Sequence, residues 1–378
     1  MKRTFPSSEI ENHVAEARKR RGCSVSDLAA SIGVSRQAIY AIEAGTYVPN
    51  TALTLRIAQA LEMPVDDLFR LKDKQKGPAS NSAKADLIAG SADVCEGQPI
   101  QLGRVDGRLI AAVPSPREWY LPAIDATAES DPVAGRINVH MPNAYVDFDN
   151  RLIIAGCDPA ASILARHLEA CGARAILVHR NSSESLGLLK KRQVHVAGTH
   201  LWHASTGETN TGATAGHFRR GGIVVISFAQ WQEGLIVERG NPKRIKTAED
   251  LTRKNIRFLN REQGAGTRLL LDAALANLGM KANQIGGYRD EAPGHLAAAV
   301  QVKSGAADCC IAMEACARAL GLSFVPLDTA RYDFIVGRQD FETPSVRILL
   351  DVLNSGTFRR ELAACAGYDT SISGARLV

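Results

Sequence analysis

The stretch from residue 24 to residue 49 constrains the fold most, because it predicts two short helices joined by a tight turn. Four apolar residues recur at the spacing that places them on one face of a helix: Val25, Leu28, Ala29 and Ile32. Ser24 or Ser26 can cap the start of this helix, and Gly33 can adopt the positive φ that a turn requires. The pattern favours a compact helical domain at the N-terminus.

The second helix of the pair, residues 36–44, exposes four polar or aromatic side chains at its start. Ser35 is an N-cap residue, and glutamine and arginine can read adenine and guanine in the major groove, while serine and tyrosine can reach phosphates. A helix-turn-helix places its reading residues at this position. We therefore expect DNA contacts from Ser35, Arg36, Gln37 and Tyr40. The alternative is an amphipathic pair in some other small helical bundle.

The flanking residues extend the pattern to five helices. A basic segment at 14–21 suits a helix before the pair, and apolar residues at 53–61 and 65–69 suit two helices after it. Residues 10–71 resemble the Cro/C1-repressor type of helix-turn-helix, the XRE family, through LAASIGVSRQAIYAIEAGTYVP and LRIAQALEMPVDDLF. The resemblance implies that the four residues above contact operator DNA, and that the protein binds it as a homodimer or higher homo-oligomer.

A chain of 378 residues is too long for this module alone, so further domains are expected. We assign residues 1–71 to the helix-turn-helix domain and residues 72–94, which are charged and then small and polar, to a linker. Residues 95–150 suggest a β-rich connecting segment with a hairpin turn at Asp106-Gly107. From residue 151 to 378, strands and helices alternate, which is typical of an α/β domain with parallel sheets.

Three loops of this domain follow predicted strands and are rich in glycine and hydroxyl residues: 156–159, 181–185 and 263–268. In parallel α/β folds, ligands bind at the carboxyl ends of strands, where backbone N–H groups and helix dipoles attract anions. The third loop, QGAGTR, adds the hydroxyl of Thr267 and the charges of Arg261 and Arg268. These loops together predict an anion site, although each loop alone could be an ordinary turn.

Several other kinds of site are less well supported. Four histidines gather near the third strand (His195, His200, His203 and His217), but they lack the HExxH spacing, and we expect no metal ligands and no cofactor. The eight cysteines form no CxxC pair, which indicates reduced thiols. The only nucleophile–base pair that we can suggest is Cys157 with His200, so we expect that the protein is not an enzyme.

A second resemblance covers residues 151 to about 370. The marks are AGCDPAASILARHL, HVAGTHLWHASTGETN, EGLIVERGNPKRI and, above all, NREQGAGTRLLLD, which resemble the periplasmic-binding-protein-like type II domains for molybdate and tungstate. The resemblance implies two α/β lobes that close on a ligand, the second spanning about 222–336. Carried over to this chain, it implies a ligand site of Cys157, Asp158, Ser182, Ser183, His200, Arg261, Gly266, Thr267 and Arg268. Glu184 departs from the glycine-rich family loop and would repel an anion if it faced inward.

The fold class that we predict is therefore multi-domain: a five-helix all-α domain, a β-rich connector and a two-lobed α/β domain. The predicted function is a one-component transcriptional regulator in which a small anion modulates operator binding. Molybdate or tungstate is the favoured effector, with a small organic carboxylate or sulfonate as the rival. An alternative of another class is a cofactor-biosynthesis enzyme with an appended DNA-binding domain. No apolar run is long enough for a membrane helix and no signal sequence is evident, so a cytoplasmic location is expected.

Overall fold

The computed structural model describes residues 10–61, 63, 65–71, 82–91, 94–114, 123–142, 148, 150–200, 218 and 222–377. The chain divides into two compact units, residues 1–79 and residues 80–378, and each is described by itself. Within the described residues, no helix combines the length and the apolar character that crossing a membrane requires.

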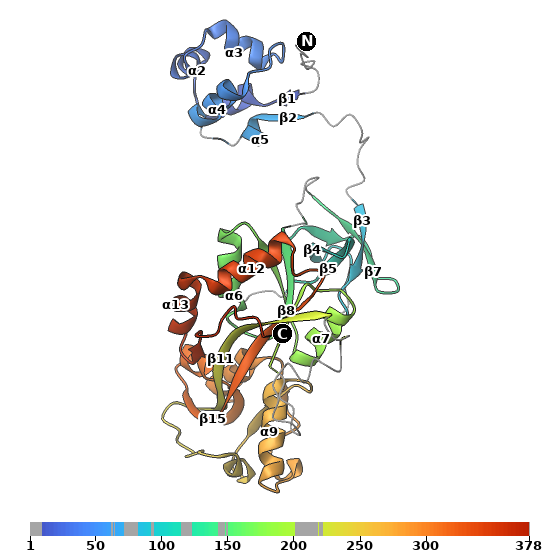
Figure 1. Ribbon diagram of the computed structural model, residues 1–378, viewed down its shortest axis with the longest axis vertical. Helices are drawn as coiled ribbons and strands as arrows, with labels where there is room; N and C mark the ends of the chain where they lie inside the picture. Colours follow the sequence, from blue (N-terminus) through green and yellow to red (C-terminus); the bar gives the residue numbers. More distant parts are fainter. Residues whose placement is uncertain are drawn as a thin grey trace. The chain divides into compact units, whose positions relative to one another are not determined.

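The N-terminal unit consists of five helices and a short two-stranded sheet (Figure 1). The helices are α1 (Val14–Arg20), α2 (Val25–Ile32), α3 (Arg36–Glu43), α4 (Thr51–Ala60) and α5 (Val65–Leu68). β1 (Ile10–Asn12) pairs with β2 (Phe69–Leu71) in antiparallel fashion and brings the two ends of the unit together. The core consists of apolar side chains from all five helices, including Leu28, Ile39 and Ile57.

Local capping explains where the helices of the pair begin and end. Ser24 accepts a hydrogen bond from the backbone N–H of Asp27 and forms a capping box, and Ser35 accepts one from Ala38. Gly33 lies in the left-handed region at φ 72°, as the turn requires. The buried ion pair between Arg18 and Glu43, with Nε and Oε1 2.7 Å apart, joins α1 to the end of α3. The predicted five-helix domain is confirmed.

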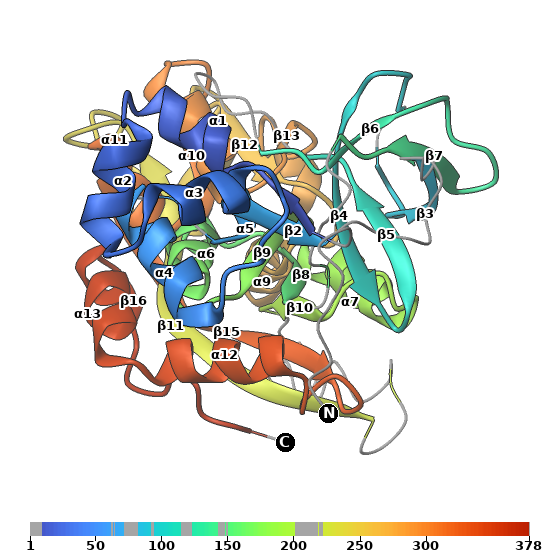
Figure 2. The ribbon, with the colours of Figure 1, turned by 90° about the horizontal axis from the view of Figure 1, so that it is seen from above.

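The second unit begins with a closed five-stranded barrel, whose strands are grouped apart from the large sheet in Figure 2. Its strands are β3 (Ser82–Leu87), β4 (Pro99–Val105), β5 (Arg108–Ala112), β6 (Ala126–Ala128) and β7 (Arg136–His140). The predicted hairpin is present, because Asp106 and Gly107 both have positive φ between β4 and β5. One expectation is wrong: residues 82–87 belong to the barrel as β3, not to the linker, because the small side chains Ala83 and Ala85 pack into the barrel core.

A buried ion pair fixes the barrel to the α/β domain. Arg151, on the first strand of that domain, donates to both carboxylate oxygens of Asp125, and its Nη2 lies 3.0 Å from Oδ1. Both side chains are buried. His195 adds a contact of 3.0 Å between Nε2 and the carbonyl oxygen of Arg104. Because these contacts are buried, we expect the barrel and the lobe that contains Arg151 to move together.

The α/β domain is built on a nine-stranded sheet in the order β13-β12-β14-β11-β15-β10-β8-β9, with β16 paired to β11. The first lobe contains β8 (Arg151–Gly156), β9 (Arg174–His179) and β10 (Val196–Thr199), with helices α6 (Ala161–Ala170) and α7 (Ser182–Lys190). The second contains β12 (Phe258–Arg261), β13 (Glu291–Ala292) and β14 (Cys309–Met313), with α9 (Gly266–Asn277), α10 (His295–Lys303) and α11 (Glu314–Leu320). Helices α12 (Pro344–Asn354) and α13 (Gly356–Ala364) pack near α6.

Two long strands connect the lobes and run side by side through the domain (Figure 1). β11 (Ile223–Val237) and β15 (Ser323–Gly337) are antiparallel, with irregularities in register at 227–229 and 233–234. Two sequence expectations are therefore wrong. The apolar runs at 222–227 and 234–238 predict two separate strands, but both lie along the single strand Ile223–Val237, because the polar residues between them still pair with β15. The sheet is also mixed and not parallel, because β15 pairs antiparallel with β10 and β11 pairs antiparallel with β14.

Candidate functional site

A buried cluster of polar and aromatic side chains lies where the two lobes meet. The ends of β8 and β10 supply Cys157 and His200 from the first lobe. The end of β12 supplies Arg261, and the first residues of α9 and α10 supply Thr267 and His295 from the second lobe. Parallel strands end at the same edge, and each following helix begins there, so both lobes direct their strand ends and helix N-termini at this cluster.

Four contacts within or beside the cluster join the lobes. His200 Nε2 lies 3.2 Å from Thr267 Oγ1. Asn181 Nδ2 donates to the carbonyl oxygen of residue 263 at 3.2 Å, and Ser183 Oγ donates to that of Gly264 at 3.3 Å. Cys157 Sγ lies 4.0 Å from His295 Nε2. Apart from Ser183, the side chains that make these contacts are buried at the junction, so the structure corresponds to a closed domain.

Arg261 is the main source of positive charge in the cluster. Its side chain is fully buried, and its Nε and Nη2 donate to the two carboxylate oxygens of Glu262 at 2.8 and 2.9 Å. Its Nη1 has no hydrogen-bond partner among the described residues. Although burial opposes its charge, the pair with Glu262 raises the pKa of Arg261. The guanidinium therefore offers an unused donor inside the protein, and such a donor is costly to leave unpaired.

The histidines of the cluster are held neutral. Burial lowers the pKa of His200 to about 3, with a further contribution from the positive charge of Arg261. The same two causes place the pKa of His295 well below its ordinary value. Neutral imidazoles can act as both donors and acceptors, so they can pair with a ligand without adding charge. His295 Nδ1 is a second buried atom that has no partner among the described residues.

A carboxylate that the sequence analysis did not predict lies beside His200. Glu233 Oε1 accepts hydrogen bonds from Trp231 Nε1 at 3.1 Å and from Thr267 Oγ1 at 3.0 Å, and it lies 3.3 Å from His200 Nε2. Burial raises the pKa of Glu233 to about 7, although these hydrogen bonds oppose the shift. The available sequence signal was Glu233 itself, the one acidic residue between the two apolar ends of β11.

The structure brings most of the predicted ligand residues together, with two exceptions. Cys157, Asp158, Ser182, His200, Arg261, Gly266 and Thr267 are all buried at or near the junction of the lobes. Ser183 is exposed. Arg268 pairs with Glu291, and its guanidinium carbon lies 5.1 Å from the centre of the Tyr288 ring, so its charge is already used.

The structure also places Glu184 and Cys157, the suspected anion-repelling carboxylate and the suggested nucleophile. Glu184 does not face the cluster, because its carboxylate caps α7 through the backbone N–H of Asn181. The suggested nucleophile, Cys157, lies beside His295, and burial raises the pKa of its thiol to about 12. Since the thiolate is the nucleophilic form, this cysteine is poorly prepared for covalent catalysis. His203 and His217 lie outside the described residues.

Asp158 also lies at the junction, next to Cys157. Its Oδ1 accepts hydrogen bonds from Tyr368 Oη at 2.6 Å and from the backbone N–H of Ala160 at 2.7 Å. Burial raises the pKa of Asp158 to about 6 despite these bonds. Its Oδ2 is buried without a partner among the described residues.

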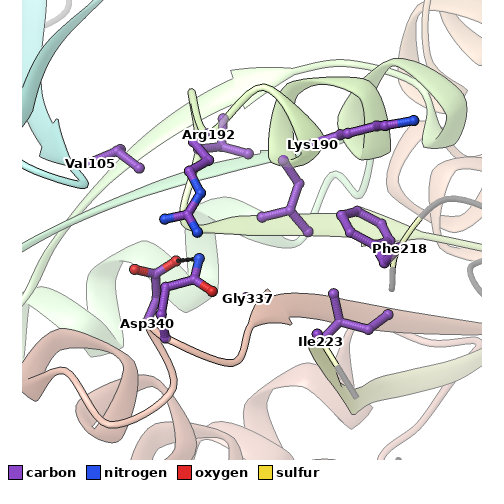
Figure 3. Close-up of a pocket in the computed structure, with 11 residues that line it drawn as sticks. Val105, Lys190, Arg192, Phe218, Ile223, Gly337 and Asp340 are labelled. Carbon is purple, nitrogen blue, oxygen red and sulfur yellow. Dashed lines mark hydrogen bonds between the residues drawn. The ribbon is translucent and has the colours of Figure 1, made fainter. Parts of the chain in front are cut away.

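A separate pocket lies between the barrel and the first lobe (Figure 3). Its volume is about 130 Å³, and its lining includes Val105, Lys190, Arg192 and Asp340. Arg192 forms an ion pair with Asp106, in which Nη1 and Oδ2 are 3.0 Å apart. Drug-sized ligands usually occupy pockets of roughly 300 Å³ or more. This pocket is therefore a weaker candidate than the buried cluster.

The predicted DNA-contacting residues gather at the start of α3. Arg36, Gln37 and Tyr40 are exposed, and Tyr40 retains 59% of its accessible surface. Ser35 is also exposed and caps the helix. The four side chains therefore share one accessible end of the second helix of the pair.

Comparison with known families agrees with both units. The model of the PBP superfamily domain matches residues 165–354, and the helix-turn-helix model matches residues 14–68. The chain belongs to the PBP superfamily, fused to an XRE-type helix-turn-helix domain. The fold class predicted from the sequence is thereby confirmed. A PBP-like domain is a ligand-binding fold, and a helix-turn-helix domain of this type is found in transcriptional regulators.

Similar proteins cover either most of the chain or its N-terminal domain. The uncharacterized protein YvgK of Bacillus subtilis (strain 168) is 32% identical over 247 residues, which span 65% of this chain and 80% of YvgK. The uncharacterized HTH-type transcriptional regulator YgzD of the same organism is 42% identical over 65 residues, spanning 17% of this chain and 98% of YgzD. Among solved structures, the sulfate-binding protein SubI of Mycobacterium tuberculosis H37Rv has a TM-score of 0.45 at 15% identity, covering 58% of this chain and 86% of SubI. No ligand follows from so distant a likeness.

Proposed function

We propose that this protein is a one-component transcriptional regulator whose PBP-like domain binds a small anion and thereby changes operator binding by the helix-turn-helix domain. The observation that carries the proposal is Arg261. A fully buried guanidinium whose Nη1 finds no partner among the described residues, at the junction of two lobes, favours an added acceptor. A bound anion would supply that acceptor and would contact both lobes.

Molybdate or tungstate is our first choice of effector, and a small organic carboxylate or sulfonate is the rival. Several features favour an anion of some kind: the N-termini of α9 and α10 point their partial positive charge at the cluster, and Thr267 supplies a hydroxyl. The neighbouring carboxylates limit how much negative charge the site can accept, because Glu262 already neutralises part of the charge of Arg261. The choice between the two effector classes therefore needs a direct measurement.

The proposed DNA-binding mode follows from the exposed end of α3. We infer that Ser35, Arg36, Gln37 and Tyr40 contact operator DNA, and that a homodimer reads two half-sites about one helical turn apart. Ligand binding would favour the closed form of the PBP-like domain and so change the geometry of the dimer. Coupling of this kind typically amounts to about 1–3 kcal/mol, or roughly 5- to 150-fold in affinity.

A thermal-shift screen of the full-length protein tests the proposal. The panel contains molybdate, tungstate, sulfate, phosphate and small organic acids, and Arg261→Gln is screened in parallel. A ligand at 100 times its Kd adds about 2.7 kcal/mol to the free energy of unfolding, which is visible as a higher melting temperature. We expect at least one anion to stabilise the unaltered protein and to lose most of this effect in Arg261→Gln. Equal stabilisation of both proteins would contradict the assignment of the site.

A further inference from the structure

Three metal-ligating side chains meet in the buried cluster. One donor atom each from Cys157, His200 and His295 lies within 4.8 Å of the other two, and all three residues are buried. A thiolate and two imidazoles form a donor set that suits zinc and similar ions. A site with three protein ligands also leaves one position of a tetrahedron open for an exogenous ligand.

A second, independent observation concerns the nitrogens of His295. Its side chain is fully buried, yet Nδ1 has no hydrogen-bond partner among the described residues, and Nε2 has only the 4.0 Å contact with Cys157 Sγ. Buried imidazole nitrogens normally have partners. A cation between His295 Nε2 and Cys157 Sγ would give this nitrogen a stronger partner than the described residues supply.

Both ring nitrogens of His200 have polar neighbours in the cluster. Its Nε2 faces the carboxylate of Glu233 at 3.3 Å and the hydroxyl of Thr267 at 3.2 Å. A carboxylate that holds one imidazole nitrogen fixes the ring and leaves the other nitrogen for a metal ion. That other nitrogen, Nδ1, has a long contact of 3.4 Å with Ser182 Oγ, so a rotation of this hydroxyl would free its lone pair.

We propose that Cys157, His200 and His295 bind a divalent cation of the zinc class, and that the effector anion completes its coordination beside Arg261. Binding forms a metal–sulfur bond and releases the thiol proton of Cys157 to solvent. The second half of this inference rests on the proposed anion-sensing function, whereas the first half does not. Positive charge is tolerated here, since Glu262 pairs with Arg261, and the buried Oδ2 of Asp158 has no partner in the described part of the chain.

Titration of the chelator-treated full-length protein with Co²⁺ tests the metal site, because cobalt replaces zinc and reports its ligands by absorption. We expect one Co²⁺ per chain, the intense visible bands of a tetrahedral site and a near-ultraviolet band from thiolate to cobalt. Cys157→Ser should remove the thiolate band, and His295→Gln should weaken binding at least tenfold. Cys171→Ser, at an exposed position, is the matched control and should change neither property.

The outcomes separate this inference from the proposed function. Absence of the thiolate band in the unaltered protein, or its persistence in Cys157→Ser, would overturn the metal site. The melting temperature of each variant after chelator treatment shows whether the variant is folded. If Cys157→Ser does not fold, His295→Gln serves as the test. If molybdate or an organic acid stabilises the chelator-treated protein while no cobalt binds, the metal site is refuted and anion sensing stands. If cobalt binds but no anion changes its spectrum or the melting temperature, the metal site stands and anion sensing fails.

Discussion

Gly266 is the residue whose substitution tests lobe closure most cleanly. It is the first residue of α9 in the second lobe, and a Cβ added there would lie 2.1 Å from the backbone carbonyl oxygen of His200 in the first lobe. Its φ is not positive, so alanine causes no backbone strain of its own. Gly266→Ala should therefore prevent the closed arrangement while leaving each lobe intact.

The expected size of the effect follows from the contacts that close the domain. Counting only residues that the structure describes, three side-chain hydrogen bonds cross between the lobes, from His200, Asn181 and Ser183. At about 0.5–1.5 kcal/mol each, they contribute roughly 1.5–4.5 kcal/mol to closure. If the ligand binds only the closed form, its apparent affinity should fall by about 10- to 2000-fold, since about 1.4 kcal/mol corresponds to a factor of ten.

Isothermal titration calorimetry of the full-length protein measures this effect, with molybdate or whichever anion of the screen stabilises the unaltered chain. Gly187→Ala is the matched control, because a Cβ at this helical position of α7 meets no atom within 4 Å. The control should bind the anion normally and gain up to about 1 kcal/mol of stability. If Gly266→Ala binds the anion within about threefold of the unaltered protein, the closed arrangement is not the ligand-binding state.

Four further substitutions have defined outcomes. Arg36→Ala should weaken specific DNA binding by about 1–3 kcal/mol in fluorescence anisotropy with an unchanged melting temperature; unchanged sequence preference would refute the reading role of α3. Arg261→Gln should abolish calorimetric anion binding and preserve DNA binding; retained anion binding would contradict the site. Asp125→Ala leaves a buried arginine unpaired and should lower the free energy of unfolding in urea by about 3–5 kcal/mol; a loss below about 1 kcal/mol would show that the pair does not hold the barrel in place. Asp308→Asn should destabilise the protein at pH 7, because hydrogen bonds from a neighbouring arginine and lysine hold the pKa of Asp308 well below its ordinary value. This stabilisation is complete above the pKa of about 3.9 that an aspartate has in the unfolded chain, and it is lost as the pH falls below that value. The difference in free energy of unfolding between the variant and the unaltered protein should therefore shrink in acid. A difference that does not depend on pH would refute the ionic explanation.

The sequence predicted the N-terminal domain well because its signals are local. Ser24, Gly33 and Ser35 mark helix boundaries by hydrogen bonds and dihedral angles that involve only neighbouring residues. The turn at Asp106-Gly107 is similarly determined by two residues. Such signals do not depend on the rest of the fold, so they can be read without it.

The α/β domain was predicted less completely because its arrangement depends on contacts between distant segments. The polar residues between 227 and 234 suggested a break, but pairing with β15 keeps the strand continuous. Glu233 became visible as a site residue only when β11 carried it to His200 and Thr267. Likewise, Cys157 and His295 are 138 positions apart, and no spacing motif could have joined them.

Arg268 shows how a side chain named from a loop motif can have other partners in the fold. Its position in the QGAGTR loop suggested a ligand contact, but its guanidinium pairs with Glu291 and lies over Tyr288. At the start of a helix, side chains two positions apart point in different directions. A charged residue in a loop motif therefore does not show which group its side chain contacts. The structure therefore brings the predicted loops together, while the individual ligand contacts remain predictions.

Operator binding with and without the anion tests the central claim most directly. A duplex selected from random DNA by the full-length protein is titrated in fluorescence anisotropy, in the absence and presence of saturating molybdate and of each other anion that raises the melting temperature. A ligand-responsive regulator should show a Kd for DNA that changes by roughly 5- to 150-fold with the anion, and Gly266→Ala should lose most of this change. An anion that stabilises the protein but leaves the Kd for DNA unchanged would contradict the account.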